Sequence, residues 1–171
     1  MPLIFVTCSI PWLTGYRKTI DFIDTVLGDA HNRNIDFLTI HPRTRNTPST
    51  APINLESLEL LTSKYGDQVP ILVSGDVFSL KSLTYSSPYL LPASVDESKP
   101  HLPKLAGLMS ARALMSNPAL FAGHETCPWE AVELFMNKVA KAPLPFKLVQ
   151  HHCTFSRGSL LSADLSARLA R

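Results

Sequence analysis

Two apolar runs that stop abruptly at small or polar residues constrain the fold of this chain most strongly. The first run ends in Val73-Ser-Gly-Asp76 and the second in Gly107-Leu-Met-Ser-Ala-Arg112. Each is followed by a helix-like segment. Buried parallel strands end in this way at the mouth of a (β/α) barrel, where small residues let backbone N–H groups approach a ligand. The two ends together predict a split phosphate site, like the one such barrels build after their last two strands.

Strand-like and helix-like segments alternate along the chain. Strands are predicted at residues 3–7, 35–40, 69–74 and 104–109, and helices at 20–29, 55–66, 77–83 and 127–139. This order predicts an α/β fold with a parallel sheet and right-handed crossovers. Residues 86–103 contain four prolines and are predicted to form a long surface loop.

Length and composition limit the architecture. The 171 residues are 45% hydrophobic and 18% charged, which is typical of a globular domain. A complete (β/α)8 barrel usually needs about 250 residues, so the predicted fold exceeds the available length. The fold that the strand ends predict and the length of the chain therefore conflict.

The remaining composition excludes several classes of protein. Cys8, Cys127 and Cys153 are too few and too widely spaced for a zinc ribbon or a disulfide framework, and we expect no metal. No apolar stretch is long enough to span a membrane, and the first residues lack the basic start of a signal peptide. These features predict a cytoplasmic or nuclear protein without a membrane partner.

Three blocks of sequence carry a family resemblance. They are His41-Pro-Arg-Thr-Arg45, Ser74-Gly-Asp76, and Ala111-Arg112 with Asn117-Pro-Ala-Leu-Phe-Ala-Gly123. The order and spacing of these blocks resemble the C-terminal half of the tRNA-dihydrouridine synthases. The residues within the blocks are most similar to those of the eukaryotic 20a/20b-type subgroup. The resemblance implies a partial (β/α)8 TIM barrel over residues 1–142, followed by a truncated helical segment over residues 143–171.

The resemblance also implies a reaction and its participants. Members of this family use FMN to reduce uridine to dihydrouridine in the tRNA D-loop, with NADPH as the reductant. The residues implied to bind the cofactor are His41, Ser74, Gly75, Asp76, Ala111 and Arg112, and those implied to face tRNA are Arg43 and Arg45. We predict that the cofactor residues converge at one end of the sheet. Taken alone, residues 74–76 are as consistent with an ordinary turn in which Asp76 caps a helix.

Parts of the family pattern are missing. The chain has no Asn-x-x-Cys-Pro motif, so no residue is assigned as the catalytic acid, and residues 5–10 lack the family's flavin-contacting lysine. We therefore expect weak FMN binding, or none, and slow turnover, unless a group such as Cys8 replaces the acid. One alternative is an inactive FMN- or phosphate-binding half barrel. Another is a different phosphate-binding barrel enzyme, which the block at residues 41–45 disfavours.

Overall fold

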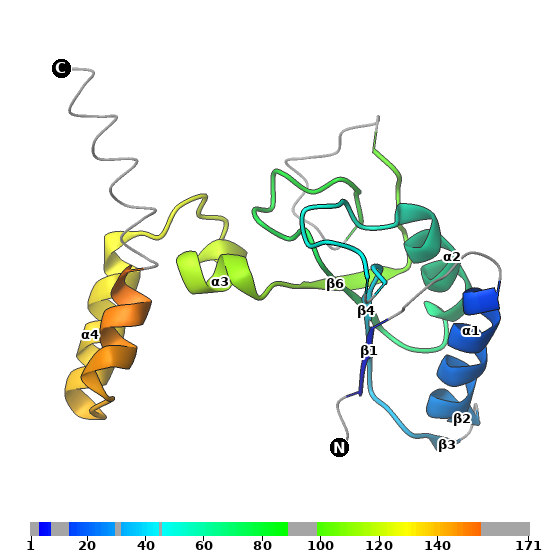
Figure 1. Cartoon of the computed structure of the whole chain (residues 1–171), viewed down its shortest axis with the longest axis horizontal. Coiled ribbons are helices and arrows are strands. Elements are labelled where there is room, and N and C mark those ends of the chain that lie inside the picture. The colour runs from blue at the N-terminus through cyan, green and yellow to red at the C-terminus, as the bar shows by residue number, and fades with distance from the viewer. Residues whose placement is uncertain (1–3, 8–13, 30–31, 45, 89–98, 155–171) are drawn as a thin grey trace. The chain divides into compact units, whose positions relative to one another are not determined.

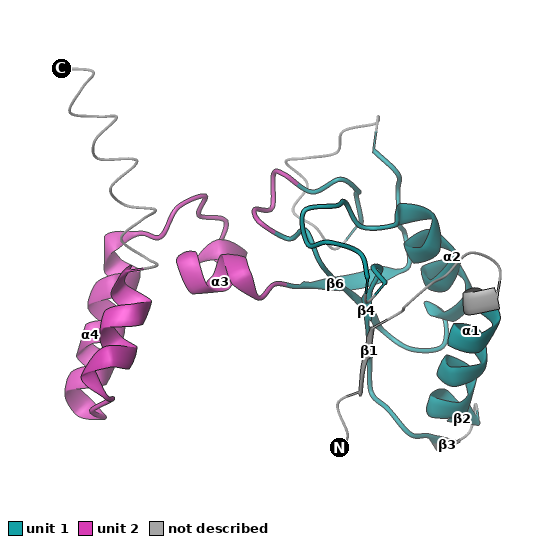
Figure 2. Cartoon of the chain, in the orientation of Figure 1, with its two compact units in different colours: residues 1–77, 83–109 teal, residues 78–82, 110–171 magenta. Residues whose placement is uncertain are grey.

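The structure is a computed structural model that describes residues 4–7, 14–29, 32–44, 46–88 and 99–154 (Figure 1). The chain divides into two compact units (Figure 2). The first comprises residues 1–77 and 83–109, and the second comprises residues 78–82 and 110–171. The domain boundary predicted at residues 142/143 falls inside the second unit, and the two family domains stay a prediction.

A parallel sheet of four strands forms the centre of the first unit. Its strands are β1 (Ile4–Thr7), β4 (Leu38–His41), β5 (Ile71–Ser74) and β6 (Leu105–Met109), in the order β1-β4-β5-β6. Every pairing is parallel. Leu38, Thr39 and Ile40 are consecutive and buried, as expected for a strand that is covered on both faces. The predicted α/β class and parallel sheet are confirmed.

Two helices connect the first three strands of the sheet. Helix α1 (Thr14–Leu27) begins before its predicted start, and α2 (Leu55–Tyr65) begins where Asn54 accepts a hydrogen bond from the Ser57 N–H at 2.8 Å. The helices lie side by side (Figure 1), and the Tyr65 hydroxyl donates to Asp24 at 2.7 Å. A short hairpin of β2 (Gly28–Asp29) and β3 (Asn32–Arg33), which the sequence did not predict, follows α1.

The helix predicted at residues 77–83 is wrong, because these residues form bends and turns. Ser79 and Ser82 explain the difference. Each serine hydroxyl accepts a hydrogen bond from the other residue's backbone N–H, at 3.1 and 3.2 Å. Such side-chain contacts compete with the hydrogen bonds of a helix.

The predicted surface loop at residues 86–103 is anchored at both of its described ends. Ser86 forms a parallel bridge with His101, and the Ser87 hydroxyl donates to the Leu105 carbonyl at 2.8 Å. Ser87 and Leu102 are buried. The middle of the predicted loop, residues 89–98, lies outside the described residues.

Helices dominate the second unit. They are α3 (Arg112–Ser116), the 3-10 turn η2 (Leu120–Ala122), α4 (Trp129–Lys141) and a helical segment at residues 146–154. Pro128 is extended and caps α4, which explains why the helix begins after the predicted Cys127. None of the helices in the described residues is long and apolar enough to cross a membrane.

Candidate functional site

A sharp turn after β5 forms the first part of the candidate site. Gly75 has φ 109° and Asp76 has φ 55°, so both lie in the left-handed region. A Cβ atom on Gly75 would come within 2.9 Å of Ile53 Cγ2 and 3.0 Å of the His41 ring. Only glycine therefore fits at this position, both in backbone conformation and in space.

His41 ends the neighbouring strand, β4, and contacts the same turn. Its Nδ1 atom lies 2.9 Å from the Ser74 carbonyl oxygen. Because a carbonyl oxygen can only accept, Nδ1 carries the proton, and in the neutral ring Nε2 is left as an acceptor. The structure thus brings His41 and the turn of residues 74–76 together at the carboxyl edge of the sheet.

Arg43 and Asp76 face each other inside the first unit. They form an ion pair in which the arginine side chain is 5% exposed and the aspartate side chain 18%. Arg43 also donates to the Ala51 carbonyl, with Nε at 2.9 Å, and the second carboxylate oxygen of Asp76 accepts from the Ile53 N–H at 2.9 Å. Arg43 therefore has internal partners, and the tRNA contact predicted for it stays a prediction.

Tyr85 is a buried residue within reach of the charge of Asp76, and it was not among the residues predicted from the sequence. Its side chain is 2% exposed, and among the described residues its hydroxyl has no hydrogen-bond partner. Burial, and to a smaller extent the charge of Asp76, raises the pKa of the Tyr85 phenol well above its ordinary value. A weak signal was available in the sequence, because the polar Thr84 separates the apolar Leu83 from Tyr85, as in a half-buried extended segment. The structure buries both Leu83 and Tyr85.

The third predicted block belongs to the other compact unit. Arg112 is the first residue of α3, and its guanidinium lies 5.7 Å from the centre of the Phe78 ring. Ala111 precedes the helix, and both residues are exposed. Their convergence with His41 and Gly75 stays a prediction, since they and those residues lie in different units. Arg45 and Cys8 lie outside the described residues.

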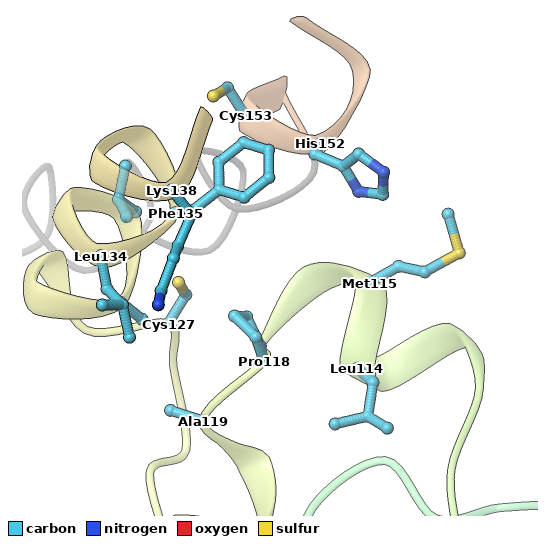
Figure 3. Close-up of a pocket in the computed structure, with 12 residues that line it drawn as sticks. Leu114, Met115, Pro118, Ala119, Cys127, Leu134, Phe135, Lys138, His152 and Cys153 are labelled. Carbon is cyan, nitrogen blue, oxygen red and sulfur yellow. The ribbon is translucent and has the colours of Figure 1, made fainter. Parts of the chain in front are cut away.

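The second unit contains an apolar cavity of about 480 Å³ (Figure 3). It lies among α3, α4 and the helical residues 146–154, and its lining includes Cys127, Phe135, His152 and Cys153. The Phe135 and His152 rings meet edge to face, 5.8 Å apart. In the part of the chain that the structure describes, no group of three or more His, Cys, Asp or Glu side chains is placed to hold a metal ion.

Comparison with known proteins shows that this chain is similar in sequence to one family. A family model described as dihydrouridine synthase (Dus) matches residues 4–158. The tRNA-dihydrouridine(20a/20b) synthase [NAD(P)+] of Saccharomyces cerevisiae is 39% identical over 120 residues, and that of Schizosaccharomyces pombe is 35% identical over 125 residues. These alignments cover 69% and 73% of this chain, but only 29% and 34% of the two relatives. No solved structure gives a significant match.

Proposed function

Because the chain belongs to the dihydrouridine synthase family, we propose that it contributes the phosphate-binding part of a flavin-dependent tRNA-dihydrouridine synthase. The observation that carries this proposal is the meeting of His41 with the Ser74–Asp76 turn at the carboxyl edge of a parallel sheet. Ligands of parallel α/β folds bind at this edge. The proposed reaction is the NADPH-dependent reduction of uridine to dihydrouridine in the tRNA D-loop.

We propose that the parallel sheet is half of an eight-stranded barrel. Its four strands follow one another in chain order, as the strands of a (β/α)8 barrel do. The family match over residues 4–158 supports this interpretation. In such a barrel the ends of β4, β5 and β6 would lie at one mouth.

We propose that the phosphate end of FMN binds at the turn after β5. The left-handed conformations of Gly75 and Asp76 suit a turn whose backbone N–H groups face an anion. Arg43 cannot supply free positive charge there, because Asp76 neutralises it. Arg112, with the adjacent Ala111, is therefore the proposed source of charge, and Arg45 the proposed contact to tRNA phosphate.

His41 has a definable part in this proposal. Because Nδ1 donates its hydrogen to the Ser74 carbonyl, Nε2 is the ring atom that can accept a hydrogen bond from a ligand. FMN, when bound, supplies the hydride chemistry, while the contribution of this chain is to bind and orient. A group able to protonate the uracil ring is not among the assigned residues, since the Asn-x-x-Cys-Pro motif is missing.

A second candidate is a catalytically inactive half barrel that retains phosphate binding, because the described turn after β5 offers backbone N–H groups that suit a phosphate. The two are separated by measuring dihydrouridine formation in unmodified tRNA, with FMN and NADPH supplied. Loss of a positioned general acid typically costs about a hundredfold to ten-thousandfold, so we expect turnover at least that far below a complete family enzyme. A chain as fast as the complete enzyme would contradict this, and Cys8→Ala would then test whether Cys8 supplies the proton.

A further inference from the structure

We propose that Arg43 and Asp76 are positioning residues that hold the phosphate-binding turn in shape. This inference rests on the proposed FMN site. It assigns both side chains an internal role, in place of direct contact with tRNA for Arg43 and with the cofactor for Asp76. We call this group the latch: the two side chains, the Ala51 carbonyl and the Ile53 N–H.

The latch joins the loop after β4 to the turn after β5. Arg43 lies near the start of this loop and Ala51 and Ile53 near its end, while Asp76 belongs to the turn. Arg43 binds both the Ala51 carbonyl and Asp76, and Asp76 binds the Ile53 N–H. A further hydrogen bond of 2.9 Å from the Asn54 N–H to the Pro42 carbonyl closes the loop at its base.

The contacts of Gly75 explain how the latch would set the shape of the turn. Both residues that lie against Gly75 are connected to the latch: Ile53 through its own N–H, and His41 as the residue from which the loop departs. Asp76 itself has φ 55°, a left-handed conformation that is uncommon for residues with a side chain, although Asp tolerates it better than most. The contacts of its carboxylate with Arg43 and the Ile53 N–H favour this conformation. Release of the latch would therefore free the backbone N–H groups of residues 75 and 76 to turn away from the phosphate.

The charges favour positioning over direct binding. Arg43 and Asp76 neutralise each other, so the pair adds no net attraction for an anion. Both side chains also have hydrogen-bond partners within the protein: Arg43 donates to the Ala51 carbonyl, and Asp76 accepts from the Ile53 N–H. The latch would thus act on phosphate through the backbone of the turn.

Binding of FMN and of riboflavin to the full chain tests this inference, because riboflavin has the same ring system and lacks the phosphate. Binding would be followed at the Gly75 and Asp76 amide signals by NMR, with FMN at millimolar concentration and riboflavin at its limit of solubility. We expect Asp76→Asn and Arg43→Met each to weaken FMN binding roughly tenfold, equivalent to about 1.4 kcal/mol, and riboflavin to cause no shift of these amide signals in the wild-type chain or in either variant. Asp67→Asn is the matched control. Asp67 precedes β5 and forms an exposed ion pair with Lys104, so this substitution should not change the affinity for FMN.

The double variant Arg43→Met with Asp76→Asn separates positioning from stability, because Asn is neutral and tolerates the left-handed conformation of residue 76. It removes both charges of the pair, so no unpaired charge remains to destabilise the fold. We expect it to be folded and still weak in FMN binding. Recovery of FMN affinity in this variant, or an unchanged FMN affinity in the single variants, would overturn the inference. A wild-type chain without FMN-dependent shifts at Gly75 would instead refute the proposed cofactor site, and the inference with it.

Discussion

At the scale of single residues, Gly75 is the position where the site depends most directly on one side chain. Its left-handed backbone and the close approach of His41 and Ile53 leave no space for a Cβ atom. Gly107 differs, because a Cβ there would lie 3.6 Å from Leu72, an ordinary contact distance. The two glycines therefore form a matched pair.

We predict that Gly75→Ala lowers the free energy of unfolding by about 1–3 kcal/mol, since strain and crowding add at this residue. Gly107→Ala should cost less than half as much. Urea unfolding of both variants measures the difference. Equal losses would mean that the turn adapts to a side chain more easily than its contacts indicate.

A second comparison concerns two buried tyrosines. The Tyr65 hydroxyl donates to Asp24, whereas the Tyr85 hydroxyl has no partner among the described residues. We predict that Tyr65→Phe costs about 1–2 kcal/mol and that Tyr85→Phe costs less than about 0.5 kcal/mol or stabilises. Thermal or urea unfolding near neutral pH compares them. A large loss in Tyr85→Phe would reveal a partner for this hydroxyl.

Tyr85 also predicts a pH dependence. The pKa of its phenol is higher in the folded chain than its ordinary 10.0, so the unfolded chain releases this proton first as the pH rises. Stability that depends on neutral Tyr85 is complete below pH 10 and is lost progressively above it. We predict that Tyr85→Phe flattens this alkaline loss relative to wild type, measured as the midpoint of urea unfolding between pH 9 and 11. Parallel curves would show that Tyr85 titrates normally.

At the scale of elements, the helices differ in how much they bury. Helix α2 buries Leu58, Leu61 and Tyr65 and is capped by Asn54, whereas α4 has no buried residue. Trp129 and Leu134 of α4 are each 60% exposed. Protection from local unfolding follows burial, so the two helices should behave differently.

We predict that the amides of α2 exchange with solvent at least about a hundredfold more slowly than those of α4. Hydrogen–deuterium exchange followed by mass spectrometry measures this directly. Similar protection in both helices would indicate that another surface covers α4 in solution.

The cap of α2 can be tested separately. Asn54→Ala should lower the stability of the chain by about 1 kcal/mol, while Asn54→Asp, which keeps the capping oxygen, should not.

At the scale of the whole molecule, the question is how much of a flavin site this chain holds. The chain spans 29% and 34% of the length of its two yeast relatives. Enclosing a flavin ring requires contacts on both of its faces, and the described site offers candidates chiefly for its phosphate. We predict that the purified chain is colourless and binds added FMN with a Kd of about 0.1 mM or weaker. A yellow protein with stoichiometric flavin would contradict this.

The parallel strands, the α2 cap and the family could all be predicted from the order of residues along the chain. Apolar runs that end in Ser74 or Met109, and Asn54 before a helix, are local patterns whose physical meaning does not depend on distant residues. The ion pair of Arg43 with Asp76 inside the first unit, and the burial of Tyr85 within reach of the charge of Asp76, follow from the three-dimensional fold and could not be predicted from the sequence. These arrangements depend on how a loop folds back over a neighbouring strand end. The helix predicted at residues 77–83 is also absent from the structure. The hydroxyls of Ser79 and Ser82 accept hydrogen bonds from backbone N–H groups of this segment, and such bonds compete with those of a helix.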